Sequence, residues 1–151
     1  MTRMDDILRR ARTIAVVGLS NKRFRPSYGV AEYMKRAGYR IIPVNPGQPE
    51  IMGETCYPDL DSVPGPIDIV DIFRRSEFVP EIVEAAIRKG AKAIWMQEGV
   101  IHEEAARRAE EAGIAVIMDR CLKVEHARYV GRMHWFGLNT GRITSVRTGL
   151  Q

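Results

Sequence analysis

A short apolar run at residues 14–17, IAVV, constrains the fold of this 151-residue chain more than any other stretch. Its length and composition are those of a buried parallel strand. Gly18 follows directly, where the backbone can turn sharply without a Cβ. A polar loop comes next and a helical pattern starts near residue 28; the loop carries the cations Lys22, Arg23 and Arg25. This order is typical of a phosphate-binding site, because backbone N–H groups and the helix dipole attract the anion.

Apolar runs and helical patterns alternate along the rest of the chain. Further strands are expected at residues 40–44, 67–73, 93–96 and 114–118. Amphipathic patterns predict helices at residues 5–12, 28–37, 76–89 and 102–112, with Ser76 as the cap of the third. Residues 47–66 are rich in proline and glycine and permit only a short strand near residues 55–57. The alternation predicts an α/β, Rossmann-like fold, with a mostly parallel sheet of about five strands and helices on both faces.

The length and the distribution of charge limit the classes of function. One domain is expected at residues 1–128, followed by a C-terminal tail at residues 129–151. From residue 127 onward the chain has four arginines and no acidic residue. This segment therefore accounts for the whole formal charge of +4, and the remaining residues have no net charge. The body therefore does not favour a nucleic-acid partner, and the tail is expected to dock on the body or to make a homo-oligomer contact.

Two further observations concern location and metals. No apolar run approaches the ~20 residues of a membrane span, and we expect a cytoplasmic protein without a membrane partner. Cys56 and Cys121 lack the spacing of metal ligands, and the three histidines lie far apart in the sequence. We therefore expect no metal site.

Polar residues and glycines follow every predicted strand. In an open parallel sheet, ligands bind outside these carboxyl ends. A nicotinamide dinucleotide fits poorly, because the turn has only the first glycine of G-x-G-x-x-G and because Asn45 stands where an acid would hold the ribose. Coenzyme A (CoA) fits better, since its diphosphate and 3′-phosphate suit the cations Lys22, Arg23 and Arg25, with Arg74 expected to converge on them.

Four segments together resemble the CoA-binding protein family, over about residues 5–128. They are residues 15–46, then DIVDIFRR, IWMQEGV and MDRCLKVEH. Members are small Rossmann-like domains, similar to the CoA-binding lobe of the succinyl-CoA synthetase α subunit. The synthetases also need a second lobe with a phosphorylated histidine and a nucleotide-grasping partner, whereas this chain has only a short tail after the CoA-type domain. The resemblance therefore implies binding of CoA or an acyl-CoA rather than ligase chemistry.

The resemblance also implies roles for individual residues. The phosphates would be held by Gly18, Ser20, Asn21 and Arg25, together with Lys22 of the same loop. The adenosine end would be flanked by Val44, Asn45 and Pro46. The path to the pantetheine would be lined by Phe73, Arg74, Ser76, Gln97, Glu98 and Gly99, with Cys121 near the CoA thiol. No residue is assigned a catalytic role.

Three alternatives stay open at the level of the sequence. Cys121 with His126 is either a thiolate–imidazole pair or, as we favour, a half-buried thiol and an unrelated histidine. Glu98 is either a general acid or base or, as we favour, a group that caps a helix or pairs with an arginine. The whole chain is alternatively an NAD(P)-dependent oxidoreductase or a CoA-responsive regulatory module that binds a partner.

Overall fold

The computed structural model describes residues 4–130, and a parallel five-stranded sheet runs through them. The strands lie in the order β2-β1-β5-β6-β7. Their bounds are β1 (Thr13–Val17), β2 (Arg40–Val44), β5 (Ile69–Ile72), β6 (Ala93–Met96) and β7 (Ala115–Ile117). All four neighbouring pairs are parallel. Almost every residue of β1, β5 and β6 is buried, because helices cover both faces of the sheet.

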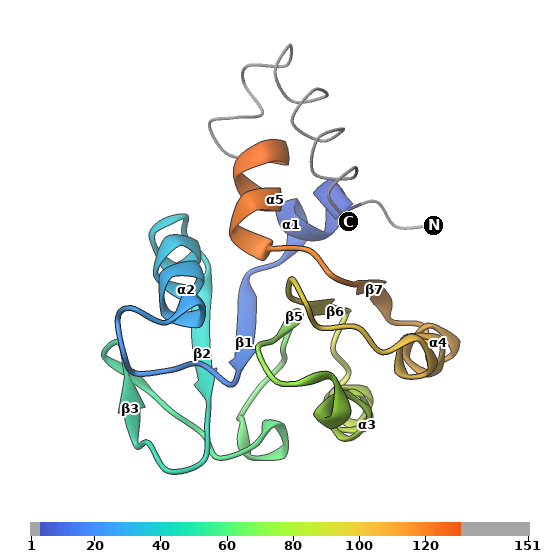
Figure 1. Ribbon diagram of the computed structural model, residues 1–151, viewed down its shortest axis with the longest axis horizontal. Coiled ribbons are helices and arrows are strands. Elements are labelled where there is room, and N and C mark those ends of the chain that lie inside the picture. The colour runs from blue at the N-terminus through green and yellow to red at the C-terminus, as the bar shows by residue number, and fades with distance from the viewer. Residues whose placement is uncertain (1–3, 131–151) are drawn as a thin grey trace.

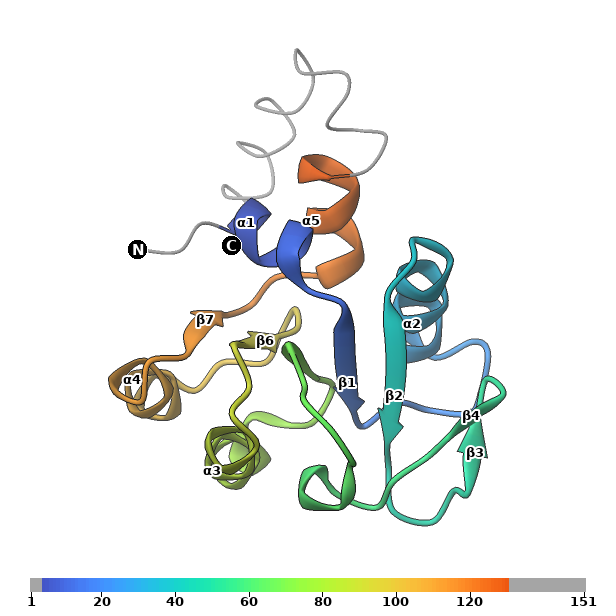
Figure 2. The same cartoon turned by 180° about the vertical axis from the view of Figure 1, so that it is seen from behind.

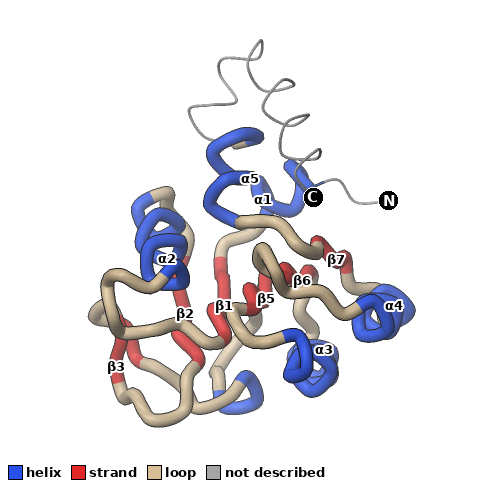
Figure 3. Tube along the Cα trace, in the orientation of Figure 1, coloured by secondary structure: helices blue, strands red, loops and turns tan. Residues whose placement is uncertain are grey.

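Helices form a layer on each side of this sheet (Figures 1 and 2). One face is covered by α1 (Met4–Arg10), α2 (Pro26–Arg36) and α5 (Leu122–Tyr129), and the other by α3 (Val79–Lys89) and α4 (Glu103–Glu111). Each layer has its own apolar core, with Val30 and Met34 of α2 in one core and Val83 and Ala106 in the other. The expected α/β Rossmann-like class is therefore confirmed, as Figure 3 also shows.

The proline- and glycine-rich stretch contains more structure than the sequence predicts. It forms a small antiparallel hairpin, β3 (Glu50–Ile51) and β4 (Glu54–Thr55), and then a 3₁₀ turn, η1 (Leu60–Ser62). Met52 and Gly53 make the tight turn with φ angles of 58° and 76°. Instead of a strand over residues 55–57, Thr55 ends β4 and Tyr57 makes a single parallel bridge to Val44.

One prediction near an element boundary is wrong, and one helix was missed. Ser76 does not cap a long helix, because it begins a separate 3₁₀ turn, η2 (Ser76–Phe78), and α3 starts only at Val79. The Ser76 hydroxyl instead accepts a hydrogen bond from the Ile101 N–H at 3.0 Å. Helix α5 was not predicted. It runs from Leu122 to Tyr129, and residues 131–151, where the tail contact is expected, lie outside the described part.

The order of the strands creates a crevice between β1 and β5. After β1 the chain crosses through α2 to β2 on one side, and after β5 it crosses through α3 to β6 on the other. At such a switch point the two connections diverge from neighbouring strand ends. Gly18 is at the bottom of this crevice with a φ of 88°, and a Cβ there would lie 2.4 Å from the Phe73 carbonyl oxygen. Only glycine fits this close approach.

A carboxyl group is buried in the middle of the sheet. Asp71 of β5 is fully buried, and its Oδ1 accepts a hydrogen bond from Gln97 Nε2 at 2.7 Å. Its Oδ2 has no hydrogen-bond partner among the described residues. Burial raises the pKa of Asp71 to about 8, although the bond from Gln97 acts in the opposite direction. The side chain is therefore mainly neutral at pH 7.

The close approach at Gly18 leads to a test of stability. We expect Gly18→Ala to lower the free energy of unfolding by about 3 kcal/mol or more, from about 1–2 kcal/mol for the left-handed backbone and about 1–3 kcal/mol for the forced contact. The control is Gly113→Ala, whose φ is also positive but whose Cβ would meet nothing within 4 Å. Urea denaturation measures both. Equal losses in the two variants would contradict the role of the contact with Phe73.

The pKa of Asp71 leads to a test of pH dependence. Between pH 5 and pH 7.5 the folded state holds a proton that the unfolded carboxyl, with a pKa near 3.9, has released. The contribution of Asp71 to stability is therefore full below pH 4 and is lost as the pH rises to 8. We expect Asp71→Asn to gain on the wild type by about 1.4 kcal/mol per pH unit in this window. Urea denaturation across the pH series that gives a constant difference would contradict this.

Candidate functional site

A hollow of about 330 Å³ lies where β1 and β5 end and α2 begins. Its lining is formed by Gly18, Ser20, Lys22, Arg25, Pro26, Ser27 and Phe73. The structure thus brings Gly18, Ser20, Lys22 and Arg25 of the predicted phosphate loop together at the switch point. Phe73, which the sequence assigns to the pantetheine path, closes the β5 side of the same hollow.

The loop that forms this hollow is held by its own hydroxyl groups. Ser27 Oγ accepts a hydrogen bond from the Ser20 N–H, and Ser20 Oγ accepts one from the Lys22 N–H, both at 3.0 Å. Helix α2 begins at Pro26, a residue that suits a first turn because it has no N–H to satisfy. The positive end of the helix and two cationic side chains therefore face one small volume, which favours an anion.

The other residues of the loop face outward. Arg23 lines a separate groove between α2 and the hairpin, and Phe24 is 78% exposed. Asn21 donates a hydrogen bond from Nδ2 to Gln48 Oε1 at 3.2 Å and is not part of the lining of the hollow. Of the predicted phosphate ligands, Asn21 is therefore the one that the structure does not bring to the hollow.

A second hollow, of about 300 Å³, adjoins the first on the other side of Arg74. Its apolar wall, for which we call it the apolar hollow, is formed by Val17, Val44, Pro46, Pro58, Leu60, Ile82 and Ala85. The charged residues Asp59, Asp61, Arg74, Glu81 and Arg88 complete its lining. Arg74 reaches both regions, since its Cδ lies 3.0 Å from the position of a Cβ on Gly18 and its guanidinium stacks on Phe78 at 4.2 Å. Two of the three residues predicted to flank the adenosine, Val44 and Pro46, line this second hollow.

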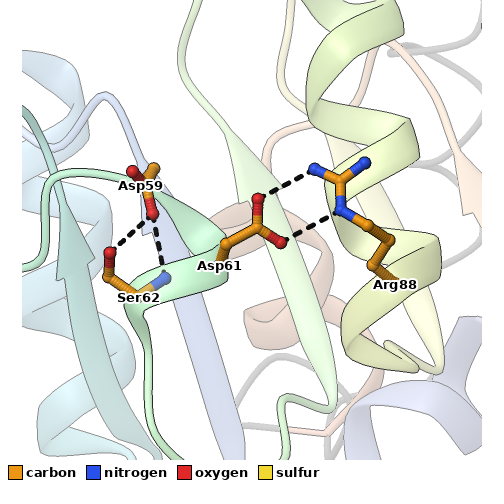
Figure 4. Close-up of polar contacts among 4 residues, drawn as sticks. All are labelled: Asp59, Asp61, Ser62 and Arg88. Carbon is orange, nitrogen blue, oxygen red and sulfur yellow. Dashed lines mark hydrogen bonds and ion pairs between the residues drawn. The ribbon is translucent and has the colours of Figure 1, made fainter.

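The outer wall of the second hollow is fixed by polar contacts (Figure 4). Asp59 accepts hydrogen bonds from the N–H and the hydroxyl of Ser62, at 2.9 and 2.7 Å, and so caps η1. The guanidinium of Arg88 on α3 donates two hydrogen bonds to Asp61, at 3.1 and 2.8 Å, and holds the pKa of that carboxyl below its usual value. These contacts place Leu60 against the apolar core.

Asn45 connects the end of β2 to the loop that follows β1. Its Nδ2 donates a hydrogen bond to the Leu19 carbonyl at 2.8 Å, and its own carbonyl accepts one from the Cys56 thiol at 3.4 Å. Cys56 is buried, and burial raises the pKa of its thiol. Asn45 is therefore a structural link between the two hollows rather than a lining residue of the second.

The ends of β6 and β7 form the remaining part of the edge. Asp119 Oδ1 accepts a hydrogen bond from the Gly99 N–H at 2.7 Å, and Trp95 Nε1 donates to the Arg120 carbonyl at 2.9 Å. These bonds join the turn after β6 to the segment that leads into α5. Glu98 and Gly99 are exposed at this turn, whereas Gln97 is only 4% exposed.

The position of Gln97 therefore differs from the prediction, which placed it on the open path to the pantetheine. Its side chain enters the sheet and donates to Asp71, so it lies beneath the edge. The alternation along β6 explains this direction, because Trp95 and Gln97 project to the same face of the sheet, the face that α5 covers. The exposed part of the QEG turn is limited to Glu98 and Gly99.

Cys121 and His126 lie on the same helix but have different surroundings. Cys121 is the N-cap residue of α5 and half-buried, and burial raises the pKa of its thiol. The buried imidazole of His126 contacts Tyr33 of α2, with Nδ1 3.0 Å from the hydroxyl, and packs edge-on against Tyr39. Burial lowers the pKa of His126. The structure thus joins His126 to Tyr33 and does not support an imidazole-activated thiolate.

Some residues of the edge were missed by reasoning from the sequence. Ser27 stands next to Pro26 at the start of a helix, and this hydroxyl position was a usable signal. Asp71 and the pair Asp61–Arg88 gave no such signal, since their partners lie far away in the sequence.

The histidines and acidic residues have structural roles or lie apart. His102 caps α4 by accepting a hydrogen bond from the Ala105 N–H at 3.1 Å. Among residues 4–130, no cluster of histidine, cysteine or acidic side chains is placed to hold a metal ion.

Comparisons with known proteins bear on this edge. The model of a family described as a CoA binding domain matches residues 12–127. The chain is 47% identical over 122 residues to the protein YneT of Bacillus subtilis strain 168, covering 81% of this chain and 90% of YneT. A solved structure from Pyrococcus horikoshii OT3 superposes with a TM-score of 0.81 at 38% identity, covering 87% of this chain and 99% of that one.

A longer relative is similar over most of this chain. The alpha subunit of ADP-forming acetate–CoA ligase II from Pyrococcus furiosus is 27% identical over 142 residues, which are 91% of this chain but 31% of that subunit. No helix in the described range is long and apolar enough to cross a membrane. With a family match over 12–127 and a nearly full-length relative at 47% identity, the chain belongs to the CoA-binding domain family.

Proposed function

We propose that this protein binds coenzyme A or an acyl-CoA along the carboxyl edge of its sheet. The observation that carries the proposal is the pair of adjoining hollows at the switch point, one basic and one apolar, on either side of Arg74. CoA has the matching composition, because a charged diphosphate lies between the adenosine and the pantetheine. The family match supports the same ligand class.

The basic hollow is assigned to phosphate groups of CoA. Lys22 and Arg25 line it, and the N-terminus of α2 adds its dipole. An arginine can hold a phosphate through two parallel hydrogen bonds, whereas a lysine acts as a point charge. Arg25 is therefore expected to contribute direction as well as charge.

The apolar hollow is assigned to the adenosine end. Val44, Pro46 and Leu60 offer flat apolar contact to a base, and Arg74 borders the hollow on the side of the phosphates. The ion pair of Asp61 with Arg88 holds the η1 wall in place before a ligand arrives. A wall fixed in this way reduces the ordering that binding would otherwise require.

The geometry disfavours the dinucleotide alternative. A nicotinamide dinucleotide uses an acid after the second strand to hold the ribose hydroxyls. Here the residue is Asn45, and its amide N–H already donates to the Leu19 carbonyl. The proposed function is binding alone, without a catalytic residue. The similarity to the ligase subunit covers only 31% of that subunit, so we do not extend its activity to this chain.

The role of Arg25 is tested by substitution. We expect Arg25→Ala to weaken CoA binding by more than tenfold, because hydrogen bonds to a charged group contribute about 1.5–3 kcal/mol each. Arg23→Ala is the matched control: it removes the same charge from the same loop but outside the hollow. Calorimetric titration measures both. Equal losses of affinity would indicate general attraction of charge rather than a site at Arg25.

The choice of ligand is tested by titrating the wild-type protein with CoA, dephospho-CoA and NAD in parallel. We expect binding of CoA, weaker binding of dephospho-CoA and no binding of NAD, because the cations would contact the 3′-phosphate as well as the diphosphate. Binding of NAD without CoA would contradict the proposal and favour the oxidoreductase alternative.

A further inference from the structure

A further hollow, of about 370 Å³, lies at the amino edge of the sheet, opposite the edge assigned to CoA. Arg12 and Tyr39 of its lining directly precede β1 and β2, so the hollow borders the first residues of these strands. Arg9 of α1 and His126 of α5 also line it. Figures 1 and 2 show α1 and α5 side by side at this edge.

His126 brings a buried imidazole to this hollow. Its side chain is only 6% exposed, and Tyr39 packs against it edge-on, with the ring centroids 5.5 Å apart. Nδ1 is occupied, because it lies 3.0 Å from the Tyr33 hydroxyl. Nε2 has no hydrogen-bond partner among residues 4–130, and it is not sealed in the interior. Since His126 lines the hollow, Nε2 is the nitrogen that is left to face a ligand there.

Two arginines give this hollow a positive charge. The exposed guanidinium of Arg12 makes no hydrogen bond or ion pair within the described range, while its backbone N–H is fixed by Asp68 Oδ2 at 2.8 Å. Burial raises the pKa of Tyr39, and the nearby charges of Arg12 and Arg9 act against this increase. No acidic side chain is present among the described residues that line the hollow. An anion is therefore favoured there.

The helix ends at this hollow offer little opposing negative charge. The partial charge of a helix C-terminus resides on its unpaired carbonyl groups. Here the Tyr39 hydroxyl donates to the Leu8 carbonyl of α1, and the Tyr39 N–H donates to the Met34 carbonyl of α2 at 3.1 Å. Arg9 Nη2 donates to the Tyr129 carbonyl of α5 at 3.0 Å. With these carbonyls engaged, the charge of the arginines dominates.

We propose that this hollow is a second ligand site, which binds the phosphate group of a small metabolite between Arg12 and His126. A guanidinium can hold a phosphate through two parallel hydrogen bonds. When the Tyr33 hydroxyl donates to Nδ1, the ring proton is on Nε2 and can be donated to a phosphate oxygen. The volume is at the lower end of the range for small-molecule sites, about 300–1,000 Å³, and leaves room for more than the phosphate.

Helix α2 separates this site from the basic hollow. Pro26 at the start of the helix lines the basic hollow, and Ala37 at its C-cap lines the hollow at the amino edge. The 11 residues of the helix correspond to a length of roughly 16 Å. The two sites are therefore distinct, and a phosphate bound at Arg12 does not compete with CoA for Arg25. The inference does not depend on the proposed function.

The protonation of His126 provides a local signal for such a ligand. Burial lowers the pKa of this imidazole, so it is mainly neutral at pH 7. The titratable and charged groups around it are Arg9 of α1, Arg12, Tyr33 of α2, Tyr39, and Lys123, Glu125 and Arg128 of α5 itself. The carboxylate of this set, Glu125, is paired with Arg128 at 3.0 Å. A bound dianion would favour the imidazolium and raise the pKa of His126.

The test follows the His126 imidazole by NMR in the full-length protein, with His126→Gln to identify its signals. Sulfate is the probe, because it has the shape of phosphate and stays dianionic throughout the titration. We expect it to raise the pKa of His126 by at least about 0.5 relative to sodium chloride of the same ionic strength. Signals of His102, which caps α4 on the other face of the sheet, should not change. No difference between sulfate and chloride, or an equal effect of acetate, would overturn the proposal.

Arginine variants locate the site. Arg12→Ala, whose exposed side chain can be removed without loss of core packing, should weaken the sulfate response of His126 at least about fivefold. The matched control is Arg10→Ala, which removes the same charge from the adjoining end of α1 but outside the lining. Arg25→Ala at the basic hollow should also leave the response unchanged. Equal weakening in Arg10→Ala and Arg12→Ala, or a loss in Arg25→Ala, would overturn the proposal.

Discussion

The contact between Gly18 and the carbonyl of Phe73 is the constraint on which the rest of the edge depends. It lets the chain leave β1 within one residue, while the Gly18 N–H donates to the Val44 carbonyl and the Phe73 N–H donates to Val17. The ends of three strands are thus joined by backbone hydrogen bonds at one point. The basic hollow, the apolar hollow and Arg74 all take their positions from this junction.

The chemical character of this edge changes from one end to the other. Cations gather over β1 and β5, where Lys22 and Arg25 meet the N-terminus of α2. Beyond β6 and β7 the edge carries a carboxyl group and a thiol, since Asp119 accepts a hydrogen bond from the Gly99 N–H and Cys121 precedes α5. An anion is therefore favoured at the first end.

Much of the sheet could be predicted from the sequence, because buried parallel strands are short apolar runs that end at polar residues. Of the five residues predicted to hold phosphates, Gly18, Ser20, Lys22 and Arg25 line the same hollow. Asn21 does not, because its amide bonds across the surface to Gln48. Helix α5 was missed for a physical reason. It buries Glu125 and Arg128 as an ion pair at 3.0 Å, so its inward face has no apolar period.

Burial that depends on distant partners was equally invisible. The sequence around Gln97 indicates an exposed turn. Only the pairing of β5 with β6 brings Asp71 close enough to accept a hydrogen bond from its side chain. The left-handed turn at Met52 was missed because this position usually carries asparagine or glycine. The position of Gln97 was thus decided by a distant partner, and the turn at Met52 by an unusual residue.

The edge strand β2 has features that hinder the addition of a further strand to the sheet. Pro43 stands in this edge strand, where it has no N–H to offer, and its carbonyl is already bonded to the Tyr57 N–H at 3.0 Å. The Asn45 N–H donates to the Tyr57 carbonyl. Tyr57 therefore occupies the outward backbone groups at the carboxyl-terminal end of β2. An open row of backbone groups would invite a second chain to add a strand and begin aggregation. The carboxyl-terminal end of β2 is therefore closed to such strand addition, and Val44 at this end also lines the apolar hollow.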